Sequence, residues 1–325
     1  MGPPTMVVSP TPQQQEYGND SATERRVNES EASWTSEGFH FYHWTSMLSL
    51  FVAPIGLLGN GVVLWLLGFR IQRTPFSVYI LNLAAADAFF LCCSFLDFFM
   101  SLLTCFYSGM YMVVTYLQCM PYTVGLSILA AISTERCLCA LFPIWYRCRR
   151  PKHTSGALCA GFWALAGMMQ VTAFLIWKYL VPHRFCPIFL IIYFLWFLLL
   201  TCIMCVSSLT LLLRVQCSSQ RRQPPRLYLL VMLTVLVFLL FGLPWGIGDS
   251  IYIPFINDSM PYGLLQSLAC VNSSLNPFIY FFVGKQGHKG REPLRLVLQR
   301  ALGEEQEVGG GMRDIPQSNT QETSS

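Results

Sequence analysis

Charged side chains are scarce in this sequence. Asp, Glu, Lys and Arg make up 12% of the 325 residues, whereas a soluble domain carries about a quarter. Hydrophobic residues make up 54%, and the mean hydropathy is +0.47. So few charges cannot cover a surface in water, so the composition excludes an ordinary soluble domain and predicts a membrane protein.

Patterns for metal binding or nucleophilic catalysis are also missing. The five histidines lie outside the apolar runs or at their margins, and none has the His/Glu spacing of a metal site. No internal repeat is visible, and Asp87 is the one clear midplane charge, whereas a transporter would show repeats and several such charges. An enzyme and a transporter or channel are therefore the weaker alternatives, and no cofactor, metal or nucleic-acid partner is expected.

Long hydrophobic runs dominate what is present. A helix needs about 20 apolar residues to cross a bilayer. Seven runs of that length can be placed, at residues 44–68, 77–103, 110–142, 155–177, 187–213, 227–254 and 262–283. The sequence therefore predicts an all-α membrane protein, a seven-transmembrane helix bundle followed by a short amphipathic helix.

The positions of Lys and Arg predict how the chain crosses the bilayer. Basic residues follow runs one, three, five and seven, whereas the loops after runs two and six carry none. Cytoplasmic loops are enriched in Lys and Arg. We therefore expect a multi-pass plasma-membrane protein with an extracellular N-terminus and a cytoplasmic C-terminus.

The two ends of the chain are polar. Residues 1–43 lack the basic start and apolar stretch of a signal peptide. Asn19 and Asn28 each stand two residues before a serine, which is the glycosylation pattern. We expect residues 1–43 to be a disordered, glycosylated extracellular segment, 44–284 the membrane domain, 285–302 an amphipathic cytoplasmic helix and 303–325 a disordered cytoplasmic tail.

Three of the runs carry polar groups at mid-span. Asn60 lies in run one, Asp87 in run two, and Asn276 in run seven near Asn272 and Ser273. Polar groups inside a membrane are expensive and commonly functional. They predict one buried network around a water or cation that is linked to a conformational switch; the alternative is a structural cluster that only fixes helix packing.

Glu135 and Arg136 sit together at the inner end of run three. Adjacent opposite charges partly neutralise one another, and Arg136 could leave Glu135 to offer its donors to a cytoplasmic partner. The alternative is an ordinary pair of charged side chains that reach the membrane boundary at a helix end.

Prolines divide the last two runs. Run seven contains Asn276-Pro277-Phe278-Ile279-Tyr280, and run six contains Phe238, Gly242 and Pro244. A proline inside a helix removes a hydrogen bond and kinks it. Such a break is tolerated in lipid only where neighbours satisfy the freed groups, so both sites are hinge candidates.

These motifs, in this order along the runs, resemble those of the rhodopsin-like G-protein-coupled receptors. Segments such as Ile132-Ser133-Thr134-Glu135-Arg136-Cys137 and Phe142-Pro143-Ile144-Trp145-Tyr146 are similar to the Mas-related subfamily. The resemblance covers about residues 44–302.

The resemblance implies a receptor that binds an extracellular ligand and activates heterotrimeric G proteins of the Gq or Gi class, with arrestin as a further partner. The ligand would be a peptide, a basic amphiphile or a small metabolite, in itch, pain or mast-cell signalling. Arg136 would engage the G protein, and Tyr280 would move inward to support it. The expected switch residues are Asn60, Asp87, Glu135, Arg136, Phe238, Gly242, Pro244, Asn276, Pro277 and Tyr280.

The disulfide common in the wider family lacks its partner here, because Tyr111 stands at the corresponding position. Cys186 either is free or pairs with Cys105 at the outer end of run two. Acids that bind cationic ligands in some relatives are replaced by apolar residues.

The acids that remain near the outer side are Asp97, Asp249 and Asp258. We expect Asp97 and Asp249 to orient a basic group, with Trp245 and Tyr252 adding aromatic surface. The alternative is that Asp249 faces water and Asp97 bonds a neighbouring helix.

Overall fold

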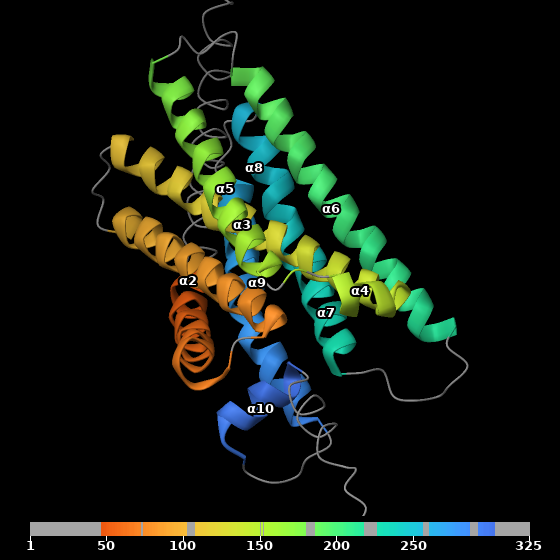
Figure 1. The fold of residues 1–325 in the computed structure, drawn as a ribbon. Helices are drawn as coiled ribbons and strands as arrows, with labels where there is room; N and C mark the ends of the chain where they lie inside the picture. Colours follow the sequence, from red (N-terminus) through yellow and green to blue (C-terminus); the bar gives the residue numbers. More distant parts are fainter. Residues whose placement is uncertain are drawn as a thin grey trace, which may run out of the picture.

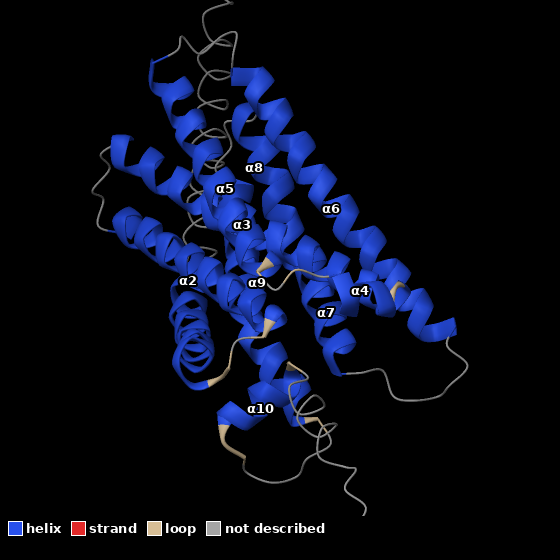
Figure 2. Ribbon diagram, viewed as in Figure 1, coloured by secondary structure: helices blue, strands red, loops and turns tan. Residues whose placement is uncertain are grey.

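The computed structural model describes residues 47–72, 74–102, 108–149, 151, 153–179, 186–217, 226–255, 260–286 and 292–302. Helices account for nearly all of these residues, and no strand occurs among them (Figure 2). The helices are the first span Met47–Arg70, α2 Pro75–Leu102, α3 Ser108–Leu141, α4 Pro143–Arg149, α5 Thr154–Tyr179, α6 Cys186–Cys217, α7 Arg226–Val237, α8 Leu243–Phe255, α9 Met260–Lys285 and α10 Leu294–Ala301.

Each of the seven predicted runs coincides with a helical segment, and the seven-helix bundle is confirmed. Six of the segments are long and apolar enough to cross a membrane by length and composition. The seventh, α9, has 26 residues but carries Asn272, Ser273, Ser274 and Asn276. Those polar residues lower the hydropathy of α9. All four are buried inside the bundle and so do not face lipid.

Helix α3 lies at the centre of the bundle (Figure 1). It packs along α2, α5 and α6, whereas α5 and α6 make few contacts with each other. Large aromatic side chains fill the middle of the bundle, and Tyr79, Phe90, Phe238, Trp245 and Tyr280 are fully buried. Exposed apolar residues cover the outward faces, as expected for helices in contact with lipid.

The sixth span is one helical rod with a π turn in its middle. The turn η2, Phe238–Gly242, separates α7 from α8, and the Leu243 backbone N–H donates to the Phe238 carbonyl. A proline bend was predicted here. The structure places one wider turn just before Pro244, and π turns, like prolines, are sites where helices bend.

The short helix α10 lies at the end of α9 and turns away from its axis (Figure 1). Val297, Leu298 and Ala301 are buried, whereas Leu294 is 53% exposed. Gly284 of α9 touches the Val297 backbone so closely that a side chain would not fit. We call the end of the bundle that carries α4 and α10 the inner end.

Two polar contacts tie the inner end together. Arg300 of α10 forms an ion pair with Glu292 at 2.6 Å. Arg226, at the start of α7, donates from Nη2 to the Gln286 carbonyl at 3.1 Å, just beyond the end of α9. The second contact joins the inner ends of the sixth and seventh spans.

Candidate receptor switch and outer site

The predicted polar network exists at mid-bundle and connects three helices. Asn276 of α9 donates from Nδ2 to Asp87 Oδ2 of α2 at 2.7 Å. Asn60 of the first span donates to the carbonyls of Gly56 and Ser273, both at 3.0 Å. The Asn60 side chain therefore contacts α9 directly, at the backbone carbonyl of Ser273, and not by way of Asp87.

The room around Asp87 is small. Asp87, Asn272, Ser273 and Asn276 line a cavity of about 10 Å³. That volume is at the lower limit for one water molecule. The polar groups are therefore packed closely enough that a change in one helix must displace the others.

An aromatic cluster lies directly beside this network. Trp245 of α8 meets Tyr122 of α3 edge-on, with ring centroids 4.6 Å apart, and meets Phe90 at 5.6 Å. The Tyr122 hydroxyl donates to the Gly242 carbonyl at 3.0 Å. Trp245 was expected to offer its face to a ligand, but its exposed fraction is 0%, so protein side chains occupy that surface in this conformation.

Only glycine fits at position 242, because neighbouring side chains occupy the place of a Cβ atom. A Cβ atom there would lie 2.6 Å from Cδ2 of Phe238 and 3.3 Å from Cγ of Asn272. The wide turn, the Tyr122 hydroxyl and the polar residue Asn272 thus meet at one point. Tyr122 was missed in the sequence, although a tyrosine directly after Pro121 in the middle of an apolar run marks the position.

At the inner end, the neighbours Glu135 and Arg136 each contact aromatic side chains. Glu135 accepts hydrogen bonds from the hydroxyls of Tyr79, at 2.8 Å, and Tyr146, at 3.0 Å. The Arg136 guanidinium lies over the Phe76 ring at 4.3 Å from the centroid. The aromatic neighbours on α2 and α4 thus act in addition to the attraction between the two adjacent charges.

Two of the buried donors near the same end have no hydrogen-bond partner among the described residues. They are Nε of Arg136 and the hydroxyl of Tyr280. Buried donors without partners cost free energy, of the order of 1–3 kcal/mol each. Arg136 and Tyr280 therefore each carry an unsatisfied donor in this conformation.

The outer half of the bundle holds a second buried polar cluster. Gln266 of α9 donates from Nε2 to Asp97 Oδ2 of α2 at 3.1 Å, and to Gln118 Oε1 of α3 at 3.4 Å. Gln118 in turn donates to Ser94 Oγ at 2.8 Å. The two glutamines were missed, although the rule that singled out Asp97, a polar residue in an apolar run, applies equally to them.

Asp249 of α8 also contacts α3. The Cys119 thiol, next to Gln118 in the chain, donates to Asp249 Oδ2 at 3.5 Å. Neither Asp97 nor Asp249 forms an ion pair within the part of the chain that the structure describes.

Some predicted positions lie outside the described residues or side chains. They are Asn19, Asn28, Cys105, Asp258 and the side chains of Cys186 and Tyr252.

Comparisons with known proteins agree with this geometry. The family described as 7 transmembrane receptor (rhodopsin family) matches residues 59–280. The chain is 44% identical to rat Mas-related G-protein coupled receptor member A over 282 residues, which are 79% of this chain and 88% of the relative. It is 43% identical to human member X2 over 80% and 83% of the two chains, and 38% identical to rat member B4 over 96% and 97%.

Proposed function

This chain belongs to the rhodopsin family of seven-transmembrane receptors and within it to the Mas-related G-protein-coupled receptors, and on that premise we propose where its ligand binds. Membership makes it a multi-pass plasma-membrane receptor without enzymatic activity, which responds to an extracellular ligand and couples to heterotrimeric G proteins. The transporter and enzyme alternatives are thereby wrong.

The proposed ligand is a peptide or an amphiphile that carries a basic group, and Asp97 and Asp249 bind that group. The supporting observation is the pair of carboxylates that point into the outer half of the bundle without a basic partner among the described residues. Burial without a counter-charge disfavours the ionised carboxylates, and a basic group on the ligand would supply the missing charge. Tyr252 and Asp258 complete the proposed pocket.

The proposed signal path descends along α3. A ligand that displaces Asp249 would change its hydrogen bond to Cys119 of α3. One turn further along α3, the Tyr122 hydroxyl donates to the Gly242 carbonyl in the π turn. Phe238 and Asn272 at that turn adjoin the Asp87–Asn276 pair. The ligand need only bind one arrangement of these contacts better than the other to shift their populations.

At the cytoplasmic side, Arg136 and Tyr280 form the proposed contact to a G protein of the Gq or Gi class, with arrestin as a second partner. Both carry buried donors that such a partner would satisfy. Sensory-neuron or mast-cell signalling is the setting that resemblance to the subfamily suggests.

Charge-neutralising variants test the ligand site. In cells that express the receptor with G-protein dissociation sensors, peptides and amphiphilic amines are screened first, and Asp97→Asn and Asp249→Asn are compared on the active ligands. Loss of a buried ion pair costs about 2 kcal/mol or more, so potency should fall by about 30-fold.

The matched control is Asp314→Asn in the tail, which should leave potency unchanged. Equal potency of all three variants for a basic agonist contradicts the ligand site. A surface-expressed receptor that responds only to acidic ligands contradicts the proposed ligand class and leaves G-protein coupling intact.

A further inference from the structure

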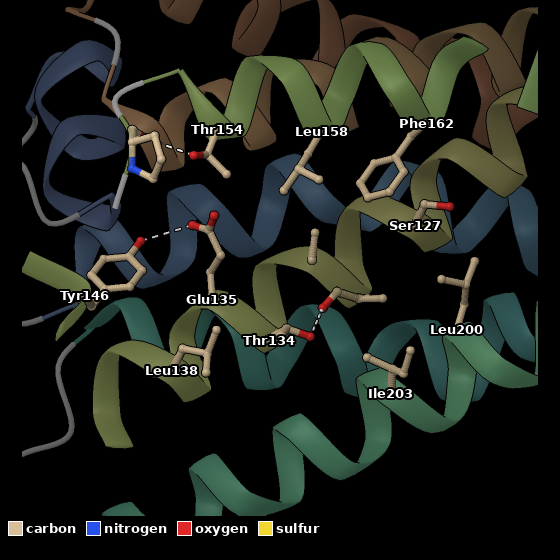
Figure 3. Close-up of a pocket in the computed structure, with 13 residues that line it drawn as sticks. Ser127, Thr134, Glu135, Leu138, Tyr146, Thr154, Leu158, Phe162, Leu200 and Ile203 are labelled. Atoms are coloured by element: carbon tan, nitrogen blue, oxygen red, sulfur yellow. Dashed lines mark hydrogen bonds between the residues drawn. The ribbon is translucent and has the colours of Figure 1, made fainter. Parts of the chain in front are cut away.

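A cavity lined by described residues opens on the side of the bundle, near the inner end. Its volume is about 430 Å³, within the range of about 300–1,000 Å³ that is typical of small-molecule sites. Figure 3 shows Glu135 and Tyr146 at one end of this cavity and Phe162 and Leu200 at the other. We call it the side pocket.

The packing of the helices explains why the side pocket exists. Helices α5 and α6 both lie against α3 but make few contacts with each other, so a gap remains between them. The floor of the gap is α3, which contributes the small side chains Ser127, Ala130 and Ala131. Leu158 of α5 and Ile203 of α6 stand at the walls and are each 38% exposed, so the pocket opens toward the lipid-facing surface.

The polar groups of the side pocket select what can bind. Ser127 donates its hydroxyl proton to the Thr123 carbonyl, Thr134 to Ala130 and Thr154 to Pro151. Each of these hydroxyls uses its single proton in that hydrogen bond and can still accept one through a lone pair. The pocket therefore offers acceptors, and a complementary ligand must bring a donor.

Charge narrows the ligand further. The lining contains the carboxylate of Glu135 and no Lys or Arg, so it disfavours a fatty acid or a phosphate head. A cation would have to leave water to enter from the hydrocarbon, which is expensive. An uncharged hydroxyl both supplies a donor and partitions into the bilayer.

We propose that the side pocket is a lipid site, which takes a neutral membrane amphiphile with an apolar body and a hydroxyl head, of the sterol type. The apolar body lies along Leu158, Phe162 and Leu200, and the hydroxyl donates at the Thr134–Glu135 end. This site is separate from the proposed ligand site at Asp97 and Asp249 and does not depend on it.

The full-length receptor in phosphatidylcholine nanodiscs is labelled with a photoreactive, clickable sterol that has a free 3β-hydroxyl, and the labelled peptides are mapped. Labels should fall on α3, α5 and α6 at the residues that line the pocket. Ala131→Phe fills the floor and should abolish this labelling, whereas Ala164→Phe, the same change on the exposed face of α5, should leave it unchanged.

Two further arms keep the result decisive. The 3-O-methyl probe, which cannot donate, should label about fivefold less, as expected for one lost hydrogen bond of about 1 kcal/mol. If Ala131→Phe does not fold, Ile203→Trp narrows the mouth from α6 and should also reduce labelling. Undiminished labelling in the filled variants, or displacement by dodecylamine but not by unlabelled sterol, would overturn the proposal.

Discussion

At the scale of single residues, the two aromatic hydroxyls Tyr122 and Tyr280 are a natural pair for comparison. Both are buried in the same bundle. The Tyr122 hydroxyl donates to the Gly242 carbonyl, whereas that of Tyr280 has no partner among the residues that the structure describes. The first hydroxyl stabilises this conformation, and the second costs free energy in it.

Removing each hydroxyl should therefore have opposite effects. Tyr122→Phe should lower the stability of the purified, ligand-free receptor by about 1 kcal/mol, and Tyr280→Phe should leave it unchanged or raise it. Thermal unfolding measures this. Tyr280→Phe should nevertheless reduce the maximal G-protein response. If both variants lose the same stability, the two hydroxyls are not in these different environments.

At the scale of helices, the π turn η2 brings the sixth span against two neighbours. Tyr122 of α3 bonds its carbonyl at Gly242, and Asn272 of α9 stands where a side chain on Gly242 would extend. The turn is thus held by contacts from elements that are far apart in sequence.

Adding a single methyl group tests this arrangement. Gly242→Ala places a Cβ against the Phe238 ring, and overpacking of that kind costs about 1–3 kcal/mol. Gly61→Ala on the first span meets nothing within 4 Å and is the matched control. Thermal unfolding of both variants should show a loss only for the first, because alanine is otherwise the better helix former. A loss of equal size for Gly61→Ala would contradict the special role of position 242.

At the scale of the whole molecule, the proposed orientation assigns each end of the chain to one side of the membrane. The basic residues that follow the odd-numbered spans support a cytoplasmic inner end. Asn19 and Asn28 then lie on the extracellular side.

Glycosylation reports this orientation directly. Treatment of the expressed receptor with a glycosidase that removes N-linked glycans should lower its apparent mass, and the double variant Asn19→Gln, Asn28→Gln should lack that shift. An epitope at the C-terminus should become accessible to antibody only after the cells are permeabilised. Staining of that epitope on intact cells would reverse the assignment.

Much of this architecture could be predicted from residue types, and the pairings could not. Asp87 and Asn276 stand out because polar residues are rare in apolar runs, so their proximity was expected. The Tyr146–Glu135 bond depends on how α4 folds back against α3, which hydropathy does not record. Trp245 was expected to face a ligand and is buried instead. The rotation of a helix about its own axis decides such contacts, and periodicity limits that rotation only loosely.

The π turn of the sixth span also has a consequence for how motion can be transmitted. It holds one residue more than an α-helical turn, and successive α-helical residues are about 100° apart around the axis. If α7 or α8 absorbed that residue, the outer half of the span would rotate by about this angle relative to the inner half. Trp245 and Asp249 would turn away from α3 together. The sixth span can therefore rotate about its own axis as well as bend. A ligand that binds Asp249 would act on that rotation.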